Sequence, residues 1–385
     1  MNNDNYINFL DLSENAIKQN EGSAVFSLDD NELKNPPFNI NDASKLSTSL
    51  CRTIENLDEE LNKFEKNFVN KHNAIFWASD YEDVFENLRI IFKSQRVRSA
   101  RLPSVNASTI FREIGLKYFL KQEKIELTDS GDVQFFNVDM LLPDNGALLL
   151  LNQTNNSFQK LSNNTTNIFF TTIDRILPNI NLVDIYRKIV TYANGAEHQD
   201  MVIFKGSPNC NNYLFIVDNR RTVFLQEKPL RQALTCVNCG RCSDVCPVLQ
   251  TIGETPYNNV FTGPVANIIL PYFESFETYV HVVYACTMCG RCEEVCPISL
   301  PVRDMIIASR QSLMSNDIME KKDRRMMAAL RKFLTNRSKM NASVFNKKHL
   351  LMKYTSPDVK KSRRPVQFCE ESCAKMYQKN HVSEE

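Results

Sequence analysis

The sequence lacks a long hydrophobic run: the longest aliphatic stretch in its 385 residues is ALLLL at 147–151. A helix that crosses a bilayer needs about 20 apolar residues, so we expect no membrane span. The first stretch, MNNDNYINFLDLSENAIK, is polar and acidic and has no apolar core of the kind that secretory signals contain. The sequence therefore favours a cytoplasmic protein.

An excess of charge and the common nucleotide-binding motifs are also missing. The net charge is +1, so the composition does not indicate a nucleic-acid partner. Neither G-x-G-x-x-G nor G-x-x-x-x-G-K-[ST] occurs, and no Ser/His/Asp or Cys/His set has a context that indicates catalysis. The five histidines are scattered, and we expect ordinary surface or core positions for His72, His198, His281, His349 and His381.

Cysteine, by contrast, is abundant. The chain has 12 cysteines, and in a reducing compartment we do not expect them to form a disulfide framework. Eight of them lie in two stretches, CVNCGRCSDVCP from Cys236 and CTMCGRCEEVCP from Cys286. Each stretch reads C-x2-C-x2-C-x3-C-P, which is the spacing of bacterial ferredoxins.

This spacing predicts two [4Fe–4S] clusters with exchanged fourth ligands. Three thiolates within seven residues can surround one corner of a cubane, and in two-cluster ferredoxins the fourth cysteine binds the other cluster. The predicted ligands of the first cluster are Cys236, Cys239, Cys242 and Cys296, and those of the second are Cys286, Cys289, Cys292 and Cys246.

The alternative is a pair of structural zinc sites with four cysteines each. Zinc usually takes paired C-x2-C units separated by a longer spacer, so two triplets that each end in a C-P pair favour iron–sulfur. Gly240 and Gly290 let the backbone pass close to sulfur. The remaining cysteines are not expected to bind metal: Cys51 and Cys210 are interpreted as buried thiols, and Cys369 and Cys373 as non-ligating residues of a terminal helix.

The rest of the chain predicts two fold classes in series. Apolar spacing indicates a helix over 41–69, capped by Asn41 or Asp42. Between 73 and about 225, strands alternate with helices, which indicates an α/β domain with a largely parallel sheet. Its last strands, YLFIV and RTVFL, are predicted to form a hairpin with the turn DNRR. The long stretch between the cysteine motifs reads as one or two buried helices around Pro271, so an all-α ferredoxin-like domain should follow.

We therefore predict four regions: an acidic helical region at 1–70, the α/β domain at 71–230, the two-cluster domain at 231–310 and a basic helical arm at 311–385. Residues 301–365 contain 17 basic and 5 acidic residues. One interpretation of this charge is a solvated helical face. The other is docking to an acidic partner, or to the inner face of the membrane near a quinone-linked acceptor.

From about residue 74 to 310 the chain resembles the lactate-utilisation iron–sulfur protein B family. The resemblance extends beyond the cysteines to a G-x-x-Y…F-x-G-P-V pattern at Gly253, Tyr257, Phe261, Gly263, Pro264 and Val265. It implies an iron–sulfur electron-transfer subunit, itself non-catalytic, in a three-component system that oxidises L-lactate to pyruvate. The implied partners are a cysteine-rich C-C-G protein and a second lactate-utilisation protein.

The α/β half departs from that family. An Asn-Glu-Gly-Asn stretch of the family is replaced by Asn152, Gln153, Thr154 and Asn155, and the segment between Asp132 and Asp144 is shorter. This half is interpreted as a degenerate scaffold. Two other functions stay open: electron relay for another substrate, such as glycolate or a heterodisulfide, and an assembly role in which the clusters are structural.

Overall fold

The computed structural model describes residues 38–69, 72–102, 110, 113–129, 131–151, 166–193, 201–206, 210–253, 257, 261, 263–315 and a few isolated positions after them. Contacts divide the chain into two units, Asn2–Ser312 and Leu313–Glu385 with Met1. The first unit holds the α/β half and both cysteine motifs. The predictions for His198, His349, His381, Cys369 and Cys373, and for nearly all of the basic arm, lie outside the described residues.

The predicted N-terminal helix is two helices, α3 (Ile40–Glu55) and α4 (Leu57–Phe68). Asn56, between them, has φ −122° and ψ 38°, which interrupts the helical backbone. The predicted caps are wrong by two or three residues: Asn39 is the N-cap, and its side chain accepts a hydrogen bond from the amide of Asn41 at 2.9 Å.

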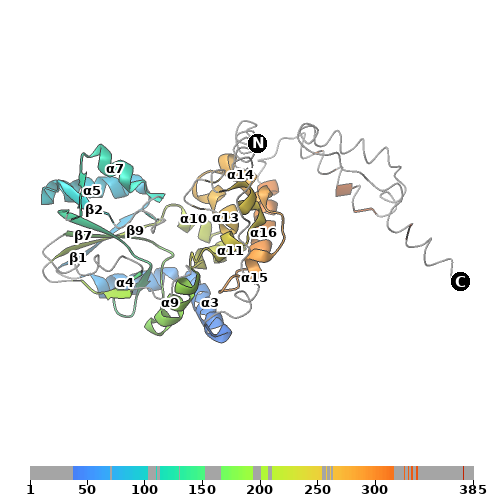
Figure 1. Ribbon diagram of the computed structural model, residues 1–385, viewed down its shortest axis with the longest axis horizontal. Coiled ribbons are helices and arrows are strands. Elements are labelled where there is room, and N and C mark those ends of the chain that lie inside the picture. The colour runs from blue at the N-terminus through green and yellow to red at the C-terminus, as the bar shows by residue number, and fades with distance from the viewer. Residues whose placement is uncertain are drawn as a thin grey trace. The chain divides into compact units, whose positions relative to one another are not determined.

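The main sheet has six strands, and all of its described pairings are parallel, which confirms the predicted fold class. In spatial order the strands are β1 (Asn73–Ala78), β9 (Asn211–Val217), β7 (Thr166–Thr172), β4 (Val133–Asn137), β2 (Ser99–Arg101) and β3 (Glu126–Leu127). Figure 1 shows α5 (Tyr81–Gln95) and α7 (Leu116–Gln122) on one face of this sheet and α4 on the other.

Alternate strand residues build two separate cores on the two faces. Phe135, Phe170 and Phe215 pack with the apolar sides of α5 and α7. Phe136 and Phe169 point the opposite way and pack with Phe64 and Phe68 of α4, among other residues. This alternation follows from the two-residue period of a strand.

A second, antiparallel sheet was not indicated by the sequence. Its order is β5 (Met140–Leu142), β6 (Ala147–Leu151) and β8 (Met201–Phe204). All of the residues of β5 and β6 are buried, so neither strand shows the alternation of apolar and polar residues that marks a half-exposed strand.

The predicted hairpin at the end of the α/β domain is wrong, because RTVFL forms helix α10 (Arg221–Leu225). The carboxylate of Asp218 accepts hydrogen bonds from the amide and the hydroxyl of Thr222, at 2.7 and 2.8 Å. These bonds start a helical turn directly after β9, and the side chain of Arg221 enters a buried ion-pair network.

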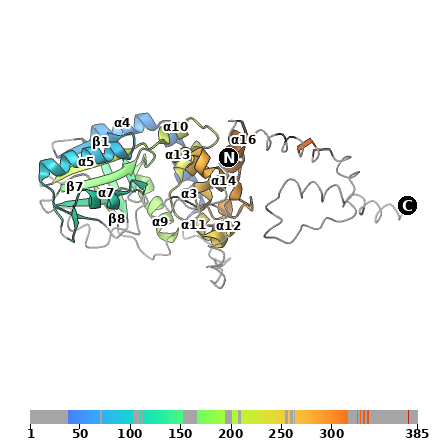
Figure 2. The same cartoon turned by 90° about the horizontal axis from the view of Figure 1, so that it is seen from above.

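The region of the cysteine motifs is helical, as predicted. Its elements are η2 (Arg231–Thr235), α11 (Arg241–Asp244), α12 (Pro247–Ile252), α13 (Gly263–Phe273), α14 (Phe276–Ala285), α15 (Arg291–Glu294) and α16 (Val302–Ser315). Helices α13 and α14 pack together, and both views place them side by side (Figure 2). Helix α3 contacts η2 and also α9 (Val183–Ala193), so it joins the two halves. None of the described helices is long and apolar enough to cross a bilayer.

Candidate iron–sulfur centre

The two cysteine motifs fold into the same loop. Cys236 follows η2 with φ −56° and ψ 122°, and Cys286 follows α14 with φ −64° and ψ 126°. Gly240 and Gly290 have φ 80° and φ 87°, and each precedes a four-residue helix, α11 or α15. These two short helices contact each other. The sequence repeat is therefore also a structural repeat, with its two copies adjacent.

Left-handed turns aim backbone amides at the thiols. Asn238 has φ 53° and Met288 has φ 60°, which is uncommon for residues other than glycine. The amide of Met288 donates to Sγ of Cys286 at 3.3 Å, and that of Leu300 donates to Sγ of Cys296 at 3.3 Å. Such donors favour a thiolate over a thiol, and they help to set the potential of a cluster bound to it.

Electrostatic influence among the thiols reveals which of them lie close together. Burial raises the pKa of Cys236, and the negative charge of Cys296 raises it further. Burial also raises the pKa of Cys239 to about 12, with added contributions from Cys236 and Cys296. Burial raises the pKa of Cys242, and the negative charges of Cys236, Cys239 and Cys296 raise it further. Cys292 makes a smaller contribution in the same direction.

The other four thiols influence one another in the same way. Burial raises the pKa of Cys292 to about 12, and the charges of Cys286, Cys289 and Cys246 add to this. Burial raises the pKa of Cys246, with contributions from Cys286 and Cys289 although Cys246 belongs to the first motif. The structure thus brings each C-P cysteine close to the triplet of the other motif.

The donor set fits iron–sulfur clusters. The two loops present cysteine thiols, and those of Cys286 and Cys296 accept backbone hydrogen bonds. Cysteine thiolates are the groups that hold [4Fe–4S] clusters. Within the parts of the chain that the structure describes, no three Cys, His, Asp or Glu side chains are placed to hold a single metal ion. Of the other predicted thiols, Cys210 is buried and Cys51 is only half-buried.

The two groups of thiols differ in their surroundings. Cys289 is exposed, whereas the first motif lies beneath residues of α9. Tyr186 of α9 is buried, and its pKa is raised by burial and by the charges of Asp139, Cys236 and Cys239. The guanidinium of Arg241 lies 4.4 Å from the ring centre of Tyr192, also in α9. These aromatic neighbours were not predicted, because no cysteine motif specifies what packs over it.

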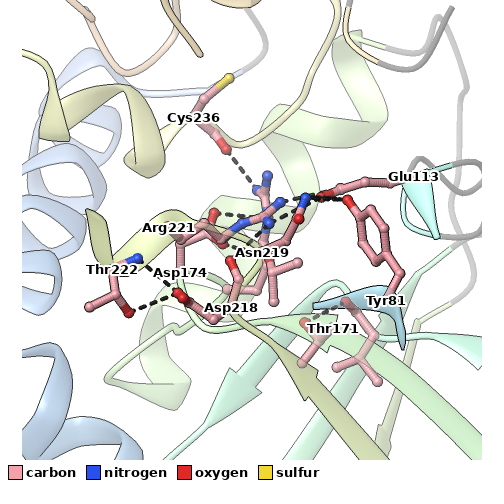
Figure 3. A network of polar contacts seen from close by, with 12 residues as sticks. Tyr81, Glu113, Thr171, Asp174, Asp218, Asn219, Arg221, Thr222 and Cys236 are labelled. Carbon is pink, nitrogen blue, oxygen red and sulfur yellow. Dashed lines mark hydrogen bonds and ion pairs between the residues drawn. The ribbon is translucent and has the colours of Figure 1, made fainter. Parts of the chain in front are cut away.

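A buried ion-pair network lies between the sheet and the first motif (Figure 3). Arg221 donates to both carboxylate oxygens of Glu113, at 3.1 and 3.2 Å, and its Nε lies 2.8 Å from Oδ1 of Asp174. The Arg221 side chain is 4% exposed and the two carboxylates are 3% exposed. Burial would raise the pKa of Asp174, but the charges of Arg221 and Arg175 hold it below its usual value.

This network reaches the first ligand loop through Arg175. Nε of Arg175 lies 3.6 Å from Oδ2 of Asp174, and its Nη1 donates to the carbonyl oxygen of Cys236 at 2.7 Å. Asp174 and Arg175 follow β7, and Arg221 follows β9, so the carboxyl edge of the parallel sheet supports the first motif. In open α/β sheets this edge is the usual place for ligands.

Comparison with known proteins identifies the class of this site. Residues 232–300 match the family model of the 4Fe-4S dicluster domain. Both cysteine motifs and helices α11 to α15 lie within this range, so the helical half carries a 4Fe–4S domain of the dicluster type.

Comparison also finds relatives whose similarity extends over about half of the chain. Lactate utilization protein B from Bacillus thuringiensis (strain Al Hakam), Bacillus cereus (strain AH187) and Bacillus anthracis (strain A0248) is in each case 24% identical over 211 residues. Each alignment covers 52% of this chain and 44% of the relative, so the chain spans less than half the length of these relatives. These matches confirm the predicted resemblance to the lactate-utilisation protein B family.

A solved structure gives a weaker likeness. The crystal structure of a DUF162 family protein from Deinococcus radiodurans aligns over 42% of this chain and 98% of that chain, with a TM-score of 0.31 and 12% identity. A TM-score of this size does not establish a shared fold.

Proposed function

We propose that this chain is an iron–sulfur electron-transfer subunit that holds two [4Fe–4S] clusters. The observation that carries the proposal is the pair of four-thiol groups, each made of one triplet and the C-P cysteine of the other motif. The first site consists of Cys236, Cys239, Cys242 and Cys296, and the second of Cys286, Cys289, Cys292 and Cys246. When bound, such clusters accept and donate one electron at a time.

The protein's own residues have three tasks in this proposal. The cysteines hold the clusters, the backbone amides at the left-handed turns donate to their sulfurs, and the buried ion pairs fix the first loop to the sheet. The four regions predicted from the sequence remain our proposed division of the chain. In it, the α/β half serves as the scaffold that carries the first loop.

The proposed reaction of the complex is oxidation of L-lactate to pyruvate. This reaction releases two electrons and two protons, and a quinone that takes up both becomes a quinol. We assign the chemistry at the hydroxy acid to partner subunits, namely the cysteine-rich C-C-G protein and the second lactate-utilisation protein. Two adjacent one-electron sites suit a relay between such a two-electron donor and the acceptor. The support for lactate is the similarity to lactate utilization protein B.

The test is to mix the anaerobically purified, oxidised chain with the two partner proteins and add L-lactate. We expect the visible absorption of the clusters to bleach only when the partners and L-lactate are all present. Glycolate is the matched alternative donor, whereas a heterodisulfide accepts electrons and is tested by whether it re-oxidises the chemically reduced clusters. Bleaching by glycolate but not by L-lactate would show that the substrate of the complex is glycolate. Full cluster content with no bleaching by either donor would favour structural clusters.

A further inference from the structure

A cavity of about 460 Å³ lies beside the first site, between α3, α9 and the loop that contains Cys296. Of the four described ligands of that site, Cys296 alone belongs to the lining of the cavity. The cavity is therefore outside the group of ligands, and one ligand forms part of its wall. Ligand-binding cavities in proteins usually have volumes of about 300–1,000 Å³, so this one can hold a small molecule.

One face of α3 forms one wall of the cavity. Its lining residues recur at intervals of three and four positions, which places them on the same side of the helix: Ile40, Ala43, Ser44, Ser47 and Thr48. The hydroxyl of Ser47 donates to the carbonyl oxygen of Ile298 at 2.8 Å, and this bond fixes α3 to the loop after Cys296. The wall thus combines apolar side chains with hydroxyl groups.

Two aromatic rings and a buried cation form another part of the lining. The rings of Phe38 and Tyr192 meet edge to face, with their centres 5.8 Å apart. The guanidinium of Arg241 lies 4.4 Å from the centre of the Tyr192 ring, and its Nη2 donates to the Tyr192 hydroxyl at 3.2 Å. Arg241 is only 6% exposed. The three side chains therefore hold one another in place, which suits the binding of a flat ring.

Arg241 connects this lining to the first site. It lies between Cys239 and Cys242 in the sequence, and its backbone amide donates to the thiol of Cys239. A molecule in the cavity is therefore next to a positive charge of the first ligand loop and next to Cys296, the fourth ligand. Electrons can pass over such a short distance, so a small acceptor in the cavity can reach a site that is otherwise buried beneath α9.

We propose that this cavity binds the ring of a quinone, which takes electrons directly from the first site. The proposal rests on the proposed function and names the acceptor. A quinone ring is flat and apolar, so Phe38 and Tyr192 can pack against it. Its two oxygens can accept hydrogen bonds from the hydroxyls of Ser44 and Thr48 and from Arg241. The first electron gives the ring a negative charge, which Arg241 stabilises, and the second electron with two protons from water completes the quinol.

The test uses menadione, a naphthoquinone, as the probe and the anaerobically purified full chain. Equilibrium dialysis measures its binding to the oxidised protein, and stopped-flow absorption measures its reduction by the chemically reduced protein after the reductant has been removed. We expect both to saturate. Ser44→Trp puts a large ring into the cavity and should weaken binding about tenfold. Lys45→Trp is the matched control on the same helix: Lys45 is outside the lining and 70% exposed, so both measurements should stay nearly unchanged.

Phe38→Ala removes a ring without adding bulk, and it should also weaken binding, even where Ser44→Trp lowers the iron content. A bulky one-electron oxidant, tris(phenanthroline)cobalt(III), can react at the exposed Cys289, so Ser44→Trp should not slow its reduction.

Iron content separates the possible failures. Low iron in the unmodified chain would overturn the proposed function. Full iron with menadione reduction that does not saturate, or with equal binding by the unmodified chain, Ser44→Trp and Phe38→Ala, would overturn only this inference. Saturable binding of flavin mononucleotide but not of menadione would overturn the choice of a quinone.

Discussion

Cys246→Ala combined with Cys289→Ala is expected to leave about four irons per chain, because crossed ligation puts both cysteines in the same site. Cys246→Ala combined with Cys239→Ala removes one ligand from each site and should leave far less iron. Both double variants lose two of the eight motif cysteines, so each is the matched control for the other. The measurement is the iron and sulfide content of anaerobically purified protein.

The reciprocal pair uses Cys296. Cys296→Ala with Cys239→Ala should retain about four irons, and Cys296→Ala with Cys289→Ala should not. The electrostatic coupling of Cys246 to Cys286 and Cys289 favours this pairing. If the ranking is reversed in both pairs, each motif closes on its own cluster, and the assignments of Cys246 and Cys296 must be exchanged.

Arg221→Met is expected to lower the free energy of unfolding by about 3–5 kcal/mol, which is the usual effect of removing one partner from a buried ion pair. Without Arg221, the carboxylate of Glu113 loses a bidentate partner and Asp174 loses the closer of its two arginines. The guanidinium also lies 4.7 Å from the ring centre of Phe273, so methionine retains part of the packing. Urea unfolding monitored by circular dichroism gives this free energy.

Two controls separate the charge effect from a general loss of packing. Arg221→Met with Glu113→Gln and Asp174→Asn removes all three charges, and it should be more stable than Arg221→Met alone. Arg89→Gln breaks an ion pair in which the arginine is 50% exposed, and it should cost less than about 1 kcal/mol. A cost for Arg221→Met as small as that for Arg89→Gln would show that the network does not stabilise the fold.

The features of the fold that the sequence predicted correctly are those determined by the spacing of residues over short stretches. The alternation of strands and helices and the helical surroundings of the cysteines both follow from residue periodicity over short stretches. RTVFL was predicted wrongly because its β-branched and aromatic residues favour a strand, whereas contacts of Asp218 and Arg221 with their surroundings make it a helix. Strands β5 and β6 are buried throughout, so a single sequence gives no periodic signal for the sheet that they form.

The candidate site shows the same limit. The eight cysteines could be found because their spacing is a property of the sequence alone. Arg175 and Arg310 could not, since they lie 61 and 24 residues from the cysteines that they contact. Such contacts depend on where α16 and the end of β7 come to lie after folding. An isolated arginine in the sequence carries no sign of that position.

The most direct test of the central claim is the metal and sulfide content of the anaerobically purified chain, measured together with its EPR spectrum after reduction. Two [4Fe–4S] clusters predict about eight irons and about eight sulfides per chain, and a signal that develops on one-electron reduction of each cluster. About two zinc ions with no iron and no sulfide would contradict this account, because eight thiolates would then form two structural zinc sites that cannot carry electrons.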